Sequence, residues 1–431
     1  MSLTMEIPAL IKVLGVFALI LFLNRLRLAL SLSLFLGSLA LGWGMAMDLE
    51  GLWRSVLRSL TQVQTISLFL IVGSILIISR LMQESGHLNR IVAGFSRLSG
   101  DERSAGLVLP ALIGLLPMPG GALFSAPMVE STFRRHGLSG EEQTAVNYWF
   151  RHIWEYWWPL YPAVVLAVAL LQVKTWQFIL VMAPMTAVMI LAGIIFILKP
   201  IPSKAQARER TISRADLMGF LWEIMPILIV VLVIILLEGS AGLLKPLGIA
   251  SGLPPALSIL PGLWVSLLWV RRVNRIPFHR VREAVWNRGI LSILLLVAAI
   301  MIFQGIMKDS RAVSEIRSEL LASRIPILLV VVLMPFLSGL ITGIGIGFVG
   351  TAFPLIIPLF PAGSTWDFLS YAALAYVLGF TGMMLSPVHL CFLVTKDYFR
   401  AGLLASYRRF YKPLLAVAGT AAALFSLSRL W

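Results

Sequence analysis

Long apolar runs are the feature that most constrains how this chain can fold. Two of them are IPALIKVLGVFALILFL (7–23) and IMPILIVVLVIILL (224–237), and similar runs recur along all 431 residues. About 20 mainly apolar residues suffice for a helix to cross the hydrocarbon core of a bilayer. Charged residues make up only 13% of the chain, whereas a soluble domain has about a quarter. We therefore predict an all-α polytopic membrane protein, since the residue alternation typical of porin strands is absent.

The net charge of +15 is explained by a membrane protein without invoking nucleic acid. Lys and Arg collect in the cytoplasmic loops of polytopic proteins, which makes such chains basic. Cys391 is the only cysteine, so an intrachain disulfide and a thiol metal cluster are excluded. We expect the lipid bilayer as the environment, no nucleic-acid partner, and neither a cofactor nor a metal.

The apolar segments fall into two groups of similar size, separated by one polar stretch. The first transmembrane unit is predicted over 1–198 and the second over 219–431, joined by a cytoplasmic linker, 199–218, that contains KPIPSKAQARERTISR (199–214). The segments are predicted at 7–23, 28–47, 64–82, 105–132, 145–172, 176–198, 219–238, 253–270, 289–307, 325–360, 367–394 and 411–428.

One segment in each unit is too rich in proline and glycine for a plain transmembrane helix. These segments are LVLPALIGLLPMPGGALFSAPMVESTF (107–133) and MPFLSGLITGIGIGFVGTAFPLIIPLFPAG (334–363). Proline removes a backbone donor, and glycine lowers helix stability by about 1 kcal/mol. Irregular backbone at membrane depth persists where protein or a water-filled cavity satisfies it. We predict two re-entrant hairpins; the alternative is an ordinary kinked helix with small residues for close packing.

The distribution of basic residues predicts the orientation. With five crossings per unit and the N-terminus outside, 24 Lys and Arg fall on the inside and 9 on the outside. Basic residues favour the cytoplasmic side, so we expect both termini outside. The first apolar run lacks a basic n-region and a small-residue cleavage site, and is predicted to be a retained helix, not a signal peptide.

The two units match one another at a nearly constant offset. Adding 225 takes Gly37 to Gly262 and MQES (82–85) to MKDS (307–310), and adding 228 takes Pro159 to Pro387. An odd number of crossings per unit turns the second unit upside down. The pattern predicts an inverted-topology repeat, which in secondary transporters places the binding site near the midplane at discontinuous helices. We predict such broken helices at 145–172 and 367–394.

The stretches LLPMPGGALFSAPMV (115–129) and RHIWEYWWPLYP (151–162) resemble those of a poorly characterised bacterial and archaeal membrane family. That family is part of the ion-transporter superfamily, with its gluconate, citrate and dicarboxylate carriers. The resemblance implies a prokaryotic inner-membrane homodimer that binds substrate between two hairpin tips and two broken helices and moves it by an elevator mechanism. The hairpins lack the Ser-Asn-Thr motif of the dicarboxylate carriers, which puts a dicarboxylate substrate and a sodium requirement in doubt.

The predicted binding residues lie in these four segments. Glycine lets backbone groups approach a ligand closely, and helix N-termini favour anions. Close helix packing is the alternative explanation for the glycines. The candidates are Gly120, Gly121 and Ser125 in the first hairpin, Arg151, His152, Glu155 and Tyr161 in the first broken helix, Thr342, Gly343, Gly345, Gly347 and Thr351 in the second hairpin, and Thr381, Gly382, Ser386 and His389 in the second broken helix.

Three ionisable residues stand out because their surroundings are apolar. Arg151, His152 and Glu155 are spaced to share one helix face, with the helix break expected at Pro159–Pro162. Only 11 apolar residues follow Pro162, so a membrane-spanning segment of about 20 residues would have to begin at roughly residue 154. Glu155 would then lie at membrane depth. Ionisable groups at that depth are costly and indicate function. An interfacial aromatic belt or a structural ion pair is the alternative.

These features predict a secondary active transporter of a small anion, coupled to H⁺ or Na⁺, and not an enzyme. Arg151 would neutralise the anion, while Glu155 and His152 would carry or gate a proton. Three other functions remain open: a cation/proton antiporter that uses Glu155, a translocase that holds a lipid phosphate with Arg151, and an intramembrane metalloenzyme that uses His152, Glu155 and His389. HxxE alone is a weak metal motif.

Overall fold

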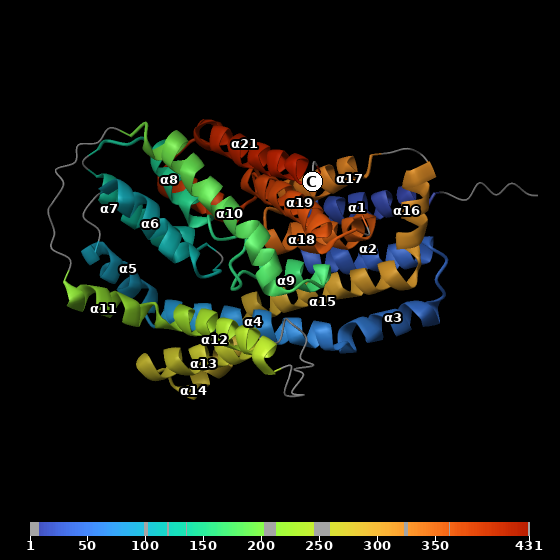
Figure 1. Ribbon diagram of the computed structural model, residues 1–431, viewed down its shortest axis with the longest axis horizontal. Coiled ribbons are helices and arrows are strands. Elements are labelled where there is room, and N and C mark those ends of the chain that lie inside the picture. Colours follow the sequence, from blue (N-terminus) through green and yellow to red (C-terminus); the bar gives the residue numbers. More distant parts are fainter. Residues whose placement is uncertain are drawn as a thin grey trace, which may run out of the picture.

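All regular secondary structure in the described part of the chain is helical. The computed structural model describes residues 8–98, 102–118, 120–134, 136–201, 213–244, 259–322, 326–361 and 363–429 (Figure 1). Within these ranges no strand is present, which confirms the all-α prediction. Residues 202–212 of the expected linker lie outside the described residues.

The helices of the two halves follow one another in the same order. The shared order is two helices, a short helix, a long helix, a second short helix, a helical hairpin, a broken helix and a final helix. The first half contains α1 (Ala9–Arg25), α2 (Leu30–Gly44), α3 (Leu49–Thr61), α4 (Val63–Glu84), α5 (His87–Leu98), α6 (Glu102–Gly114), α7 (Ala122–Phe133), α8 (Gly140–Arg151), α9 (Pro162–Leu171) and α10 (Thr175–Gly193), which continues as η1 (Ile194–Leu198).

The second half repeats this order after one additional helix at its start. It contains α11 (Arg214–Glu223), α12 (Met225–Leu244), α13 (Ile259–Val273), α14 (Phe278–Val285), α15 (Arg288–Asp309), α16 (Ala312–Ala322), α17 (Ile327–Thr342), α18 (Gly345–Ile356) with η4 (Ile357–Leu359), α19 (Thr365–Met384), α20 (Leu390–Tyr398) and α21 (Leu403–Leu427). Helix α11 begins before residue 219, where the second unit was expected to start. The side chain of Ser213 caps it by accepting a hydrogen bond from the backbone N–H of Asp216 at 3.0 Å.

Five helices in the described residues are long and apolar enough to cross a membrane: α4, α10 with η1, α15, α19 and α21. The pair α11 and α12 passes the same test but bends by 71° between its two parts. Such lengths match the roughly 20 residues that a bilayer core requires. The chain is therefore a multi-pass membrane protein.

Short helices occupy four stretches between the predicted apolar segments. These helices are α3, α5, α14 and α16. On α3, Leu52 and Val56 are buried while Trp53 and Arg54 are exposed. A helix with one apolar face has low mean hydropathy, so it resembles a loop when only long apolar runs are sought.

Each predicted hairpin consists of two helices that pack against each other. Helix α6 contacts α7 in the first hairpin, and α17 contacts α18 in the second. The second hairpin turns at Gly343, whose φ of 64° is a left-handed conformation that favours glycine. Which membrane face each hairpin enters from, and the inverted relation of the two halves, stay predictions.

The second hairpin is held closely against the second broken helix. A Cβ atom added at Gly382 of α19 would lie 2.1 Å from the backbone oxygen of Phe336 in α17. Since the obstructing atom belongs to a backbone, no side-chain rotation can relieve the clash.

We expect Gly382→Ala to lower the free energy of unfolding by about 1–3 kcal/mol, the usual range for an overpacked core. Thermal unfolding in detergent measures the effect. Gly15→Ala is the matched control because nothing lies within 4 Å of the added Cβ on α1. This control should be neutral or slightly stabilising, since alanine favours a helix over glycine. Equal unfolding temperatures for the two variants would contradict the close α17–α19 packing.

Candidate functional site

A cavity of about 490 Å³ lies where the two hairpin tips and the two broken helices meet. The turn between α1 and α2, helix α4 and the start of α15 complete its wall. Contacts divide the surrounding helices into two groups. Helices α1, α2, α4 and α15 pack on one another, while the hairpins pack on the broken helices (Figure 1). The cavity, which we call the central cavity, therefore lies between two groups of helices.

The first broken helix is interrupted earlier than predicted. Helix α8 ends at Arg151, residues 152–161 form turns, and α9 begins at Pro162. The break was expected at Pro159–Pro162, so the expectation of one continuous helix face for Arg151, His152 and Glu155 was wrong. Proline at the first position of a helix fits, because its missing N–H would have no partner there. The prolines mark the end of the break, not its start.

Tryptophan side chains bind this break to the first hairpin. The indole N–H of Trp154 donates to the carbonyl oxygen of Ala111 at 2.9 Å, and that of Trp158 donates to Leu115 at 3.0 Å. The Tyr161 hydroxyl donates to the Gly114 carbonyl oxygen. These aromatic residues satisfy carbonyls near the end of α6, so they hold the break and the hairpin tip together. This is a more specific role than that of an interfacial belt.

Arg151 is buried at the cavity wall, with only 2% of its surface exposed. Its guanidinium donates to the sulfur of Cys391 at 3.3 Å and to the backbone oxygen of Met118 at 3.1 Å. Nε has no hydrogen-bond partner. Among the described residues, no carboxylate forms a salt bridge with Arg151. A buried guanidinium without a carboxylate is costly, which makes the site attractive for an anion.

His152 and Glu155 remain close to each other despite the break. The Nδ1 atom of His152 lies 2.6 Å from the backbone oxygen of Tyr148, and Nε2 lies 3.7 Å from Oε1 of Glu155. His152 is fully buried, whereas the Glu155 side chain is 13% exposed and lines the central cavity. Both residues therefore contribute to the same part of the wall as Arg151.

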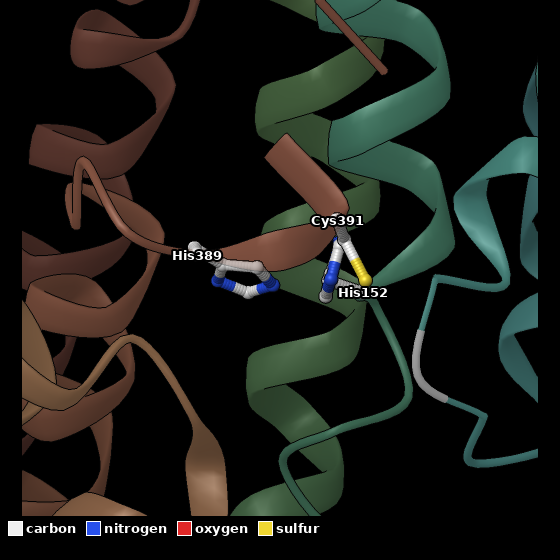
Figure 2. A group of neighbouring side chains, drawn as sticks. All are labelled: His152, His389 and Cys391. Carbon is white, nitrogen blue, oxygen red and sulfur yellow. The ribbon is translucent and has the colours of Figure 1, made fainter. Parts of the chain in front are cut away.

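The second break brings His389 to the same place. Helix α19 ends at Met384, and His389 directly precedes α20. Its ring lies 5.0 Å from the ring of His152, measured between centroids. Tyr148 lies against both rings, and its hydroxyl donates to the Met384 carbonyl oxygen at 3.0 Å. Two segments more than 200 residues apart thus form one cluster with Cys391 (Figure 2).

Half of the predicted binding residues line the central cavity. They are Gly120, Arg151, His152, Glu155, Tyr161, Gly343, Gly345 and His389. The other half does not line it: Gly121, Ser125, Thr342, Gly347, Thr351, Thr381, Gly382 and Ser386.

Hydroxyl groups in the second set bond within their own segment. Thr342 donates to Ser338 at 2.7 Å, Thr351 to Gly347 at 2.8 Å and Thr381 to Val377 at 2.8 Å, in each case to a backbone oxygen four residues earlier. The Ser125 hydroxyl donates to Ala122 at 3.3 Å, and the Ser386 hydroxyl accepts from Val388 N–H at 3.3 Å. Serine and threonine hydroxyls in helices often bond to the backbone in this way, which leaves them with less hydrogen-bonding capacity for a ligand.

Other cavity residues were missed. Cys391 was not predicted because its neighbours are distant in sequence. Tyr148, which does not line the cavity but packs against the rings of His152 and His389, was not predicted either. Asn24, Ser31 and Ser292 lie on the wall that α1, α2 and α15 provide. Ser292 does match Ser67 at the repeat offset of 225, but that match alone does not indicate a cavity.

A family model described as "Protein of unknown function (DUF401)" matches residues 9–430. No match was found among curated proteins. Among solved structures, the fold is similar to that of the YdaH transporter from Alcanivorax borkumensis, described as having an unusual topology, with a TM-score of 0.56 and 15% sequence identity. The similarity covers 89% of this chain and 90% of that one. At this identity the likeness concerns the fold.

Proposed function

This chain belongs to the DUF401 family, and from that premise we propose that it is a secondary active transporter of a small organic anion, coupled to H⁺ or Na⁺. The shared fold with the YdaH transporter supports transport, and the described chain has its hairpins and breaks around one cavity. Membership of the ion-transporter superfamily, a homodimer and a prokaryotic inner membrane with both termini outside belong to the same proposal.

Arg151 is the observation that carries the choice of an anion. It is buried, lines the central cavity and bonds only to neutral groups or to the Cys391 sulfur. An incoming carboxylate would supply the missing negative charge. Arginine suits this task because its planar fork matches a carboxylate with two parallel hydrogen bonds.

The cavity wall also favours an anion with one charged group and an apolar body. Among the described residues that line it, Arg151 is the single cationic side chain of Lys or Arg type, and Glu155 adds a negative charge nearby. Leu28, Leu76 and Leu296 represent the largely apolar remainder of the wall. A second carboxylate would lack a cation and would approach Glu155. We therefore propose a monocarboxylate or a similar monoanion.

Alternating access by an elevator motion fits the position of the cavity between two groups of helices. The hairpins and broken helices contact each other extensively, whereas α15 meets them mainly through α18, and α4 meets them through α9. A displacement of the hairpin group along α4 and α15 would carry Arg151 and the anion together. The helices of both groups would stay packed, so the motion costs little buried surface.

Uptake into proteoliposomes tests this function. We expect uphill accumulation of a radiolabelled monocarboxylate when a pH or Na⁺ gradient is imposed, and none with empty liposomes. Dicarboxylates should compete at least about tenfold more weakly, since one unpaired carboxylate costs more than 1.4 kcal/mol. Cation-linked proton flux without any organic substrate would favour an antiporter instead. Phospholipid that copurifies against Arg151 and is transferred between leaflets would favour a lipid-phosphate translocase.

A further inference from the structure

His152, His389 and Cys391 form a compact group whose joint presence the binding of an anion by Arg151 does not require. One ligand atom from each residue can be chosen so that all three lie within 4.8 Å of one another. All three residues are buried and line the central cavity. In Figure 2 one nitrogen of the His389 ring points toward His152 and Cys391, which lie side by side. The three side chains come from both broken helices, so the group exists only in the folded chain.

Hydrogen bonds fix which nitrogen of each imidazole carries the proton. A carbonyl oxygen can only accept, so Nδ1 of His152 donates to Tyr148 at 2.6 Å, and Nδ1 of His389 donates to Met383 at 3.2 Å. In the neutral rings, Nε2 then keeps its lone pair. Histidine ligands of metal ions are typically held in this way, with the second nitrogen bound to a backbone carbonyl or a carboxylate.

The lone pair of His152 is left without a partner in a buried position. Its Nε2 has no hydrogen bond, and the residue is 0% exposed. Burying a polar atom without a partner is energetically costly. The nearest carboxylate oxygen, on Glu155, is 3.7 Å away, too far for a hydrogen bond. A fully buried acceptor that faces a thiol and a second imidazole is an arrangement a metal ion would satisfy.

We propose that His152, His389 and Cys391 bind one zinc ion or a similar borderline-soft metal ion through their Nε2 and Sγ atoms. Thiolate and imidazole are the ligands that zinc prefers, and the thiol releases its proton on binding. Three protein ligands leave a fourth position open, as in zinc sites that bind a further small ligand. Because all three residues line the central cavity, that position faces the cavity.

The surrounding charges are compatible with a cation. Arg151 lies 3.3 Å from the Cys391 sulfur, so the negative charge of a thiolate would contact both the guanidinium and the metal. Glu155 contributes a second negative charge on the same side, since its Oε1 atom lies 3.7 Å from Nε2 of His152. This inference goes beyond the proposed function, which includes no metal. Metal binding is an equilibrium property, so it can be measured without any transport.

Cobalt titration tests the site directly. The full-length protein is purified in detergent with a histidine-free affinity tag, stripped with a chelator and titrated with Co²⁺ as a spectroscopic substitute for zinc. We expect one ion per chain and a thiolate-to-cobalt charge-transfer band in the near ultraviolet. Cys391 is the only cysteine, so this band can come from no other residue of the chain. Zn²⁺ should displace Co²⁺ and abolish the band.

Substitutions then identify the ligands. Cys391→Ser should remove the charge-transfer band, and His152→Gln or His389→Gln should weaken cobalt binding by more than the roughly 10–100-fold typical of changes around a metal site. His279→Gln is the matched control because His279 is exposed on α14. Metal-free thermal unfolding of each variant shows that the fold is retained. The metal site would be excluded by any of three results for the wild-type protein: fewer than one cobalt ion bound per chain, no charge-transfer band, or a cobalt affinity equal to that of His152→Gln. Each of these results is independent of the uptake assay.

Discussion

Replacing Arg151 by glutamine is expected to weaken the apparent affinity for the transported anion roughly 30- to 4000-fold. Removing one partner of a buried, hydrogen-bonded charge pair costs about 2–5 kcal/mol, and 1.4 kcal/mol corresponds to a factor of ten. Arg151 is buried at the cavity wall and forms no salt bridge within the described residues, so no other group there would replace it. The dependence of initial uptake rate on anion concentration in proteoliposomes measures the loss.

Two further variants make this prediction specific. Arg151→Lys keeps the positive charge but loses the planar fork, so its affinity should lie between those of the wild type and Arg151→Gln. Arg282→Gln removes an exposed arginine from α14 and should leave uptake unchanged. Arg151 also bonds to Met118 and Cys391, so thermal unfolding of the variants is compared. Uptake at wild-type affinity by Arg151→Gln would exclude the anion-binding role.

The main features of the fold are predictable from the sequence because they depend on local composition. Long apolar runs identify the spans, and Pro110, Pro117 and the Gly120–Gly121 pair mark the first hairpin. Helices α3, α5, α14 and α16 escaped prediction since only one face of each is apolar. A pattern with a period of 3.6 residues is weak over 8 to 13 residues.

The candidate site is only partly predictable, for a different physical reason. Arg151, His152, Glu155 and His389 were found because ionisable groups are unusual in apolar segments. That His152 meets His389 follows from two breaks in separate halves, which no local pattern contains. Cys391 is an ordinary apolar residue by composition, and only its contacts give it significance. The serine and threonine hydroxyls in the helices were wrongly predicted to line the site, because a sequence does not show that they bond to their own backbone.

The interface between the second hairpin and α15 decides whether the proposed displacement can occur. Gly350 of α18 faces Ile300 of α15, and a Cβ atom added at Gly350 would lie 2.2 Å from the Cδ1 atom of Ile300. Both residues are buried. A hairpin that slides along α15 needs small residues at this surface. Because Gly350 has no side chain, the backbone of α18 lies directly against the side chain of Ile300.

We expect Gly350→Leu to slow transport by roughly 5- to 150-fold, because overpacking of about 1–3 kcal/mol would disfavour the conformation in which α18 and α15 touch. Initial uptake rates at saturating anion measure this effect. Cobalt binding at His152, His389 and Cys391 should persist, since those residues lie on the broken helices. Gly419→Leu is the control, as nothing lies within 4 Å of the added Cβ on α21.

The double variant Gly350→Leu with Ile300→Ala separates a local steric block from general damage. Truncating Ile300 removes the atoms that the new leucine meets, so the pair should recover part of the uptake rate that Gly350→Leu loses. Residues in contact show such non-additive effects, typically of 0.5–3 kcal/mol, whereas distant ones do not. If Ile300→Ala instead lowers the rate further by its own full single-variant effect, the two side chains act independently. The α18–α15 contact would then not control transport.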